Sequence, residues 1–172
     1  MKMDLNAYIR EFPDFPKPGI IFKDISPILN SPHAMHYVTD QICDHFKNKK
    51  IDLIAGAESR GLIFACALAT KLNKGMIMVR KKGKLPGPTV EFAYDLEYGQ
   101  AVMEIQKDAI SKGQNVLLID DLLATGGTAN AAEELVMQLG GNVVGHAFIV
   151  ELKALKGLEK IKTNEVFSLI QY

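Results

Sequence analysis

The segment VLLIDDLLATGGT, residues 116–128, decides the fold of this chain. Its first four residues are apolar and follow the turn-like Lys112-Gly113-Gln114-Asn115, which predicts a buried strand. After the polar run ATGGT, apolar residues recur over 131–139 at the spacing of a helix face, and Gly140-Gly141 supplies a helix stop. The segment therefore predicts a loop that joins the end of a strand to the start of a helix.

Such a loop is suited to binding an anion. A helix N-terminus has unpaired backbone N–H groups and the positive end of the helix dipole, and glycines let a ligand approach the backbone. The common nucleotide-binding pattern GxxxxGK[ST] places a lysine inside the loop, but no Lys or Arg occurs between Asn115 and Leu152. A triphosphate site of that kind is therefore excluded.

Two carboxylates, Asp120 and Asp121, stand directly ahead of this loop. They would repel a phosphate unless the ligand also carries hydroxyl donors or a divalent cation. A ribose 5-phosphate meets this condition, because its 2- and 3-hydroxyls can donate to the carboxylates while its phosphate binds the loop. The predicted phosphate-binding residues are Ala124, Thr125, Gly126, Gly127 and Thr128. The alternative is a structural strand-turn-helix with a solvated acidic turn, which the ordered combination of residues disfavours.

Strand and helix patterns alternate along the chain. We expect a short amphipathic helix over 1–11, an ordered loop or cap over 12–19, and a solvated helix or turn over 152–162. Helices are expected over 31–46, 60–72 and 131–139, and strands over 51–57, 76–79, 101–106, 116–119 and 143–150. This order predicts an α/β fold with a mainly parallel central sheet flanked by helices. Ligands bind such sheets at the carboxyl ends of the strands.

The composition is that of an ordinary globular domain, with 48% hydrophobic and 23% charged residues among 172. Lys plus Arg and Asp plus Glu number 20 each, so no bulk positive field indicates a nucleic-acid or membrane partner. No run of eighteen apolar residues and no signal-like N-terminus is present, which predicts a cytoplasmic protein. Cys43 and Cys66 are expected to be reduced and buried.

LLIDDLLATGGT resembles the phosphoribosyl-pyrophosphate binding motif of type I phosphoribosyltransferases, which is four hydrophobic residues, two acids and a Thr/Gly-rich loop. Five further segments resemble those of family members that act on adenine, in the same order: FPDFPKPGIIFKDISPIL (12–29), AESRGLIFA (57–65), RKKGKLPGPT (80–89), YDLEYG (94–99) and EIQKDAI (104–110). The resemblance implies one domain over 1–172, with a cap over about 1–32 and a flexible lid over about 81–98. It implies purine salvage, in which adenine and phosphoribosyl pyrophosphate give AMP and pyrophosphate.

The resemblance also assigns the pyrophosphate site. It implies that backbone amides around Glu58, Ser59 and Arg60, together with the guanidinium of Arg60, hold the leaving group. Additional positive charge would come from the RKKGK segment, namely Arg80, Lys81 and Lys84. By itself, Arg60 would be interpreted as a surface arginine and RKKGK as a solvated face or a nucleic-acid patch.

The lid and the base pocket rest on the resemblance almost entirely. The stretch from Lys81 to about Tyr98 is predicted to be irregular, with Glu97 as the acid/base residue and Tyr98 closing the lid. The implied catalytic residues are Glu97, Asp120, Asp121 and Arg60. The implied base-binding residues are Ile21, Phe22, Lys23 and Leu122. Lys23 stands where the family is expected to have arginine, which would alter base affinity if a guanidinium is needed.

The resemblance implies Mg²⁺ as the cofactor, bound mainly by pyrophosphate and ribose oxygens without a direct protein ligand, and it implies a homodimer. None of the four histidines shows metal-ligand spacing. Two alternatives stay open. One is a phosphoribosyltransferase for hypoxanthine, guanine or xanthine. The other is a regulator that binds the sugar phosphate without turnover and contacts RNA or DNA through RKKGK.

Overall fold

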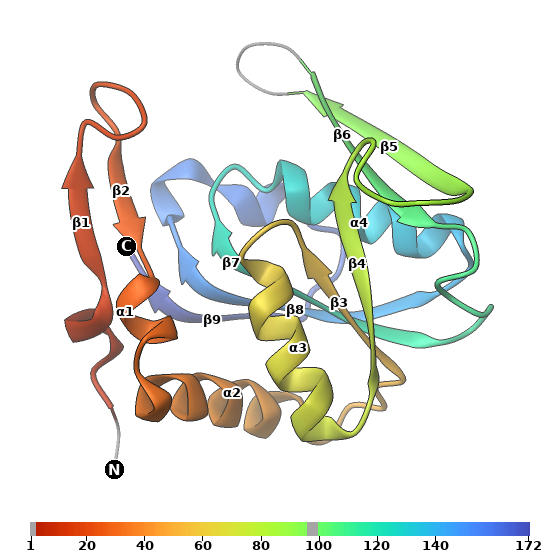
Figure 1. Ribbon diagram of the computed structural model, residues 1–172, viewed down its shortest axis with the longest axis horizontal. Coiled ribbons are helices and arrows are strands. Elements are labelled where there is room, and N and C mark those ends of the chain that lie inside the picture. Colours follow the sequence, from red (N-terminus) through yellow and green to blue (C-terminus); the bar gives the residue numbers. More distant parts are fainter. Residues whose placement is uncertain (1–2, 96–99) are drawn as a thin grey trace.

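The chain folds around one seven-stranded sheet with helices on both faces (Figure 1). The computed structural model describes residues 3–95 and 100–172. Their elements are, in chain order, η1 (Leu5–Tyr8), β1 (Arg10–Pro13), β2 (Ile21–Asp24), α1 (Ser26–Leu29), α2 (Pro32–Phe46), β3 (Leu53–Ala57), α3 (Gly61–Leu72), β4 (Gly75–Lys81), β5 (Thr89–Asp95), β6 (Gln100–Gln106), β7 (Asn115–Leu123), α4 (Gly127–Gln138), β8 (Asn142–Glu151), η2 (Lys153–Leu155), η3 (Gly157–Lys160) and β9 (Val166–Gln171).

The sheet has the strand order β5-β6-β4-β3-β7-β8-β9. The five strands β4, β3, β7, β8 and β9 each run parallel to their neighbours within this group. Strand β6 pairs antiparallel with both β4 and β5 at one edge. The predicted fold class, a mainly parallel sheet flanked by helices, is therefore confirmed.

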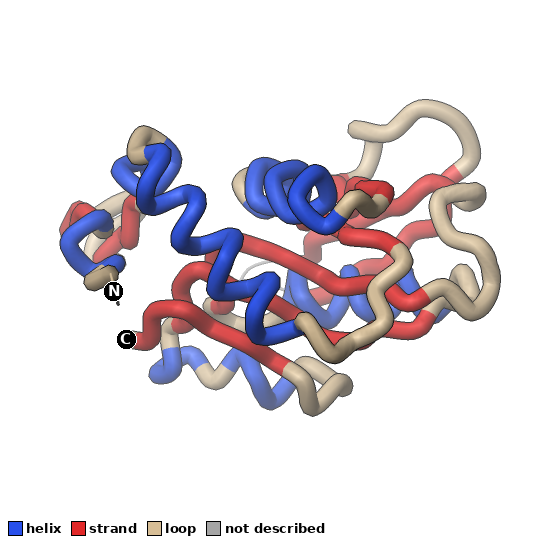
Figure 2. The backbone as a smooth tube through the Cα atoms, turned by 90° about the horizontal axis from the view of Figure 1, so that it is seen from below, coloured by secondary structure: helices blue, strands red, loops and turns tan. Residues whose placement is uncertain are grey.

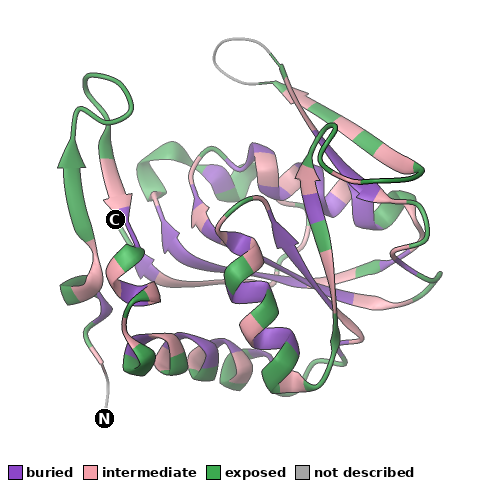
Figure 3. Ribbon diagram, viewed as in Figure 1, coloured by how far each residue is buried: buried purple, intermediate pink, exposed green. Residues whose placement is uncertain are grey.

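Both faces of the central strands are buried (Figure 3). Leu117 of β7 packs with Phe64 of α3 on one face, whereas Leu118 packs with Leu135 of α4 on the other. Figure 2 shows α2 and α3 on one side of the sheet and α4 on the opposite side. A strand covered on both faces needs consecutive apolar residues, and this explains the run that opens the 116–128 segment.

The predicted helix over 1–11 was wrong. Within the described residues 3–11, only Leu5–Tyr8 forms a helical turn, and Arg10–Pro13 is a strand that pairs antiparallel with Ile21–Asp24. Arg10 also donates to Asp24 at 2.6 Å across this pair. The cross-strand pairing outweighs the weak helical pattern of such a short segment. The β1–β2 pair stands apart from the main sheet in Figure 1.

The prediction of an irregular stretch from Lys81 to about Tyr98 was also wrong in part. Thr89–Asp95 forms strand β5, which pairs antiparallel with β6. Val90, Phe92 and Tyr94 alternate with more exposed residues and pack on the core under α4. Residues 82–88 are irregular, and the buried carboxylate of Glu104 accepts from their N–H groups at Lys84 and Leu85. Glu97 and Tyr98 lie outside the described residues.

Three smaller differences complete the comparison with the sequence. Strand β7 continues to Leu123 instead of ending at Ile119, because it keeps pairing with β8 beyond the end of β3. Residues 166–171 form an additional strand, β9, at the edge of the sheet. Cys66 is exposed and Cys43 only half-buried, so the prediction of buried cysteines was wrong, although both are free. Among the described helices, none has the length and apolarity needed to cross a membrane.

Candidate active site

The loops predicted to bind substrate leave the sheet at one edge. Strand β3 pairs with β4 up to Ala57 and Val79, and with β7 up to Gly56 and Ile119. Because these strands are parallel, the loops after all three start at neighbouring positions. In Figure 1 the β1–β2 pair and the β5–β6 pair stand on either side of this edge. The tertiary structure therefore gathers the separate sequence motifs into one region.

Asp120 and Asp121 occupy the last part of β7. Asp121 is 6% exposed, and its Oδ2 lies 2.8 Å from Nη2 of Arg60. Burial raises the pKa of Asp120, and the neighbouring Asp121 carboxylate raises it further. Burial also raises the pKa of Asp121, although the Arg60 guanidinium opposes this change. Ionising the pair is thus unfavourable, and a ligand with hydroxyl donors or a cation would stabilise its ionised form.

Arg60 joins three parts of the site. It is the N-cap residue of α3, where no side chain caps the helix. Its guanidinium forms the ion pair with Asp121 and lies 5.1 Å from the ring centroid of Phe22. Cations above an aromatic face are attracted to its quadrupole. One side chain therefore links the predicted pyrophosphate loop, the carboxylate pair and the predicted base-binding segment.

The ATGGT loop surrounds a small cavity of about 90 Å³, lined by Tyr94 and residues 122–129. Gly126 has φ 79° and is the N-cap residue of α4, without a side-chain cap. The positive end of α4 is therefore open to a ligand. The structure brings all five predicted phosphate-binding residues and Leu122 to the wall of this cavity.

The basic segment lies beside the predicted pyrophosphate loop. Arg80 Nε is 3.3 Å from Glu58 Oε2, and the Lys81 N–H donates to the same oxygen at 2.9 Å. Burial alone would raise the pKa of Glu58, but these contacts lower it. The Glu58 carboxylate is thus an internal partner of Arg80, while the side chains of Lys81 and Lys84 are exposed. The peptide between Glu58 and Ser59 is cis.

The predicted base-binding residues are only partly brought together. Phe22 reaches Arg60, and Leu122 lines the phosphate cavity. The ammonium group of Lys23 instead forms an ion pair with Glu11 and lies 3.7 Å from the ring centroid of Tyr172. Ile21 is 54% exposed. The ammonium group of Lys23 is therefore occupied by Glu11 and Tyr172. This leaves the main chain of Lys23 to contact a base.

Tyr94 is a site residue that the sequence interpretation missed. Its hydroxyl lies 3.0 Å from Oγ1 of Thr128. Its ring covers Gly127 so closely that a Cβ at Gly127 would come within 2.6 Å of the Tyr94 Cδ2. The alternation of Val90, Phe92 and Tyr94 is typical of a strand and could have revealed this residue.

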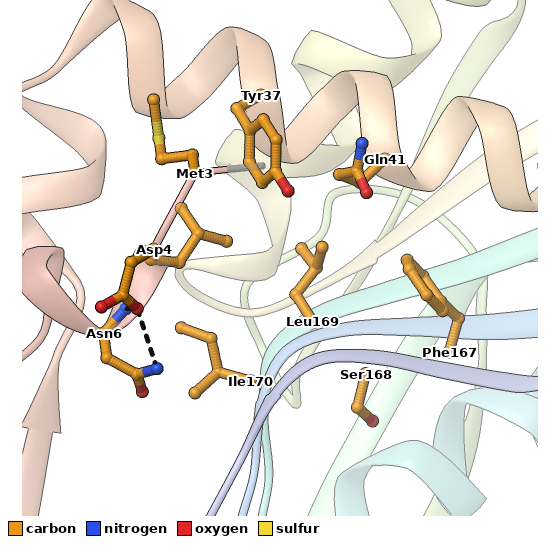
Figure 4. A pocket seen from close by; sticks show the side chains of 10 residues that line it. Met3, Asp4, Asn6, Tyr37, Gln41, Phe167, Ser168, Leu169 and Ile170 are labelled. Carbon is orange, nitrogen blue, oxygen red and sulfur yellow. Dashed lines mark hydrogen bonds between the residues drawn. The ribbon is translucent and has the colours of Figure 1, made fainter. Parts of the chain in front are cut away.

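A separate cavity lies away from these residues (Figure 4). It measures about 530 Å³ and is enclosed by the N-terminal segment, α2 and β9. Its walls are mixed, with the apolar side chains of Phe167 and Leu169 facing polar ones such as Gln41. The carboxylate of Asp4 at its rim accepts from the Asn6 side chain at 3.1 Å. None of the predicted substrate-binding residues lines this cavity.

Asp120 and Asp121 do not form a metal site by themselves. In residues 3–95 and 100–172 no cluster of three or more His, Cys, Asp or Glu side chains is placed to hold a metal ion. Asp121 is already paired with Arg60. The donor set thus suits a cation that brings most of its ligands with the substrate.

Comparisons with known proteins agree with this geometry. Residues 25–171 match the family model for the phosphoribosyl transferase domain. An adenine phosphoribosyltransferase of Nitrosopumilus maritimus is 54% identical, over 99% of this chain and 100% of that protein. The crystal structure of adenine phosphoribosyltransferase from Thermoanaerobacter pseudethanolicus superposes with a TM-score of 0.95 at 46% identity, covering 98% of each chain. That of the Saccharomyces cerevisiae enzyme, complexed with an imino-altritol bisphosphate and adenine, gives 0.91 at 43% identity, covering 96% of each.

The fold, the carboxylate pair and the family match together define the class: the chain belongs to the phosphoribosyl transferase family. Within that family, its full-length similarity places it among the adenine phosphoribosyltransferases.

Proposed function

We propose that this protein transfers the 5-phosphoribosyl group from phosphoribosyl pyrophosphate to adenine, giving AMP and pyrophosphate in purine salvage. The observation that carries the proposal is the arrangement at the end of β7. The half-buried Asp120 and the buried Asp121, whose Oδ2 lies 2.8 Å from Arg60, stand a few residues ahead of an uncapped helix N-terminus. This arrangement offers acceptors for two ribose hydroxyls and backbone donors for a 5-phosphate.

Phosphoribosyl pyrophosphate would lie along the carboxyl edge of the sheet. Its 5-phosphate would bind the residue 124–128 loop, and its ribose hydroxyls would donate to Asp120 and Asp121. Its pyrophosphate would bind the backbone amides around Glu58, Ser59 and Arg60 and the guanidinium of Arg60. The side chains of Arg80, Lys81 and Lys84 would add positive charge. Because Arg60 forms an ion pair with Asp121, its guanidinium would then contact both the leaving group and the sugar site.

The reaction breaks the bond between ribose C1 and the pyrophosphate oxygen and forms a bond from C1 to a purine nitrogen. The sugar becomes cationic between these two events, and the purine nitrogen loses its proton. Catalysis would come mainly from positioning and from charge stabilisation by Asp120 and Asp121. Glu97 would accept or return the purine proton, and Tyr98 would help close the lid.

Mg²⁺ is proposed as the cofactor, bound through pyrophosphate and ribose oxygens and water. When bound, it would neutralise charge on the leaving pyrophosphate. Asp120 and Asp121 would interact with it through the substrate, and Arg60 would share the neutralisation of the pyrophosphate.

The base is proposed to stack against Phe22 and Leu122, with main-chain atoms near Ile21 and Lys23 contacting the ring edge. Adenine is favoured over a 6-oxopurine because the similar Saccharomyces cerevisiae enzyme is complexed with adenine. The charge of Lys23 is engaged by Glu11 and Tyr172, which supports recognition through the backbone instead of a cationic side chain. We further propose a homodimer in the cytoplasm, on the strength of the family resemblance; sedimentation analysis would test the oligomeric state.

The test is nucleotide and pyrophosphate formation with Mg²⁺ and phosphoribosyl pyrophosphate, offering adenine, hypoxanthine, guanine and xanthine in parallel. We expect product with adenine alone. Turnover only with a 6-oxopurine would preserve the sugar-phosphate site but reject the base assignment. Tight binding of phosphoribosyl pyrophosphate without turnover on any base would favour the regulator.

A further inference from the structure

Residues 152–163 lie between β8 and β9, and at Gly157 they pack directly against the phosphate loop. The contact is made by main chain on main chain. A Cβ at Gly126 would come within 2.2 Å of the Gly157 carbonyl oxygen, and a Cβ at Gly157 would come within 2.3 Å of the Ala124 carbonyl oxygen. Both distances are far below van der Waals contact. The backbone around Gly157, called the wall below, therefore lies directly against the backbone of the loop.

This segment is anchored at both ends. At its start, the Leu152 N–H donates to the Leu123 carbonyl oxygen at 2.9 Å. At its end, the carboxylate of Glu133 accepts from the N–H groups of Lys162 and Thr163, each at 2.8 Å. Glu133 belongs to α4 and is only 2% exposed. The wall is thus tied to β7 and to α4, the two elements that the phosphate loop connects.

The two facing glycines are required for different reasons. Gly126 has φ +79°, a left-handed conformation that residues with a side chain rarely adopt. It also has no space for a Cβ. At Gly157 the requirement is the space itself, because Ala124, Leu123 and Gly126 all approach it. A side chain at 157 must therefore push the wall away or push the loop into its cavity of about 90 Å³.

We propose that Gly157 is a positioning residue for the 5-phosphate site: its main chain fixes the Ala124–Gly126 backbone, and thereby the amides that bind phosphate. The proposal rests on the proposed function and extends it to a segment without a substrate-binding motif. It predicts that a disturbance at 157 weakens ligands that carry a 5-phosphate. Ligands that use only the pyrophosphate loop should be unaffected, since Ser59 and Arg60 lie on a different loop.

The experiment compares Gly157→Ala with wild type by calorimetric binding of ribose 5-phosphate and of pyrophosphate, and by steady-state kinetics. We expect the Kd for ribose 5-phosphate and the KM for phosphoribosyl pyrophosphate to rise together by about 10-fold or more, because small displacements of binding groups are costly. The Kd for pyrophosphate and the KM for adenine should stay within about two-fold of wild type, which is a change below 1 kcal/mol.

Gly75→Ala is the matched control. Its added Cβ would meet only the Cδ2 end of the Leu53 side chain, at 2.9 Å, and it lies at the start of β4, away from the carboxyl edge. A second variant, Glu133→Gln, loosens the anchor of the wall without adding atoms beside the loop. We expect it to raise the Kd for ribose 5-phosphate as well, to a smaller extent, even if Gly157→Ala fails to fold.

Two results would overturn the proposal. One is an unchanged Kd for ribose 5-phosphate in both Gly157→Ala and Glu133→Gln. The other is an equal loss of ribose 5-phosphate and pyrophosphate binding, which would indicate general destabilisation. The ribose 5-phosphate readout does not depend on the base. A wild-type protein that binds it but fails to convert adenine would therefore contradict the proposed function while leaving the role of Gly157 testable on its own.

Discussion

The hydroxyl of Tyr94 lies 3.0 Å from Oγ1 of Thr128, so the end of β5 is tied to the first turn of α4. This contact links two predicted functional segments, because Tyr94 is three residues before Glu97 in the sequence and Thr128 belongs to the predicted phosphate-binding loop. Each hydroxyl can donate to or accept from the other. The Thr128 hydroxyl could therefore turn from Tyr94 to a ligand in the predicted phosphate site.

For Tyr94→Phe we predict a rise of about five-fold in the KM for phosphoribosyl pyrophosphate, corresponding to the loss of one hydrogen bond of about 1 kcal/mol. The ring stays in place over Gly127, so the melting temperature should change little. Steady-state kinetics with varied phosphoribosyl pyrophosphate would measure the effect. Tyr37→Phe, in the distant cavity, is the control. The same KM for phosphoribosyl pyrophosphate in the two variants would show that the Tyr94 hydroxyl plays no part in binding this substrate.

For Gly61→Ala we predict a loss of at least about ten-fold in kcat/KM together with lower stability. The added Cβ would come within 2.7 Å of Asp120 Oδ1 and 2.8 Å of the Ile119 carbonyl oxygen, so the carboxylate must move. Overpacking of this kind costs about 1–3 kcal/mol in unfolding free energy. Kinetics at a temperature well below the melting point separates the two effects. Wild-type kcat/KM under those conditions would contradict a requirement for a fixed Asp120.

For Asp120→Asn we predict higher stability at neutral pH and lower activity. Burial and the neighbouring Asp121 raise the folded-state pKa of Asp120, so ionising this group is less favourable in the folded than in the unfolded chain. The stability that its protonated form contributes is present at acidic pH and is lost as the pH rises through the raised pKa.

Asparagine does not ionise, so the variant avoids this loss of stability. Each gain of about 1 kcal/mol in the free energy of unfolding would raise Tm by about 2–4 °C. Thermal unfolding at neutral and acidic pH would show a difference that shrinks as the pH falls. An asparagine variant less stable than wild type at neutral pH would argue against an unfavourable buried charge. Unchanged turnover would argue against the ribose-binding role.

For the wild-type protein we predict a loss of stability as the pH falls from about 6.5 to about 4, part of it caused by His146. Burial lowers the pKa of His146 to about 4, from the usual 6.5, so over this range the unfolded chain binds more protons than the folded chain. The full effect is on the order of 3 kcal/mol. The neighbouring titratable group is Glu133, whose Oε2 lies 3.9 Å from His146 Nε2.

His146→Leu removes the titrating group while keeping an apolar side chain in the site, where Nε2 has no hydrogen-bond partner among the described residues. Urea unfolding over the same pH range should show a flatter curve for this variant. Parallel curves for variant and wild type would assign the acid sensitivity to other groups.

The sequence predicted the regular part of the fold well where local pattern and tertiary environment agree. The helix predicted over 31–46 is observed as Pro32–Phe46, and the strand predicted over 143–150 as Asn142–Glu151. The segments that were predicted wrongly owe their structure to pairing with other strands. Arg10–Pro13 is a strand because of Ile21–Asp24, and Thr89–Asp95 because of β6.

The sequence by itself determined the phosphate-loop motif, because strand, carboxylates, glycines and helix start are consecutive and their chemistry follows from their order. Only the tertiary structure decided which distant groups complete the site. Arg60 lies next to Asp121, Tyr94 next to Thr128, and Gly157 next to Gly126. These contacts join residues that are far apart in the chain, and they depend on strand order and backbone approach. Local residue patterns carry no information on either, so only the folded chain reveals them.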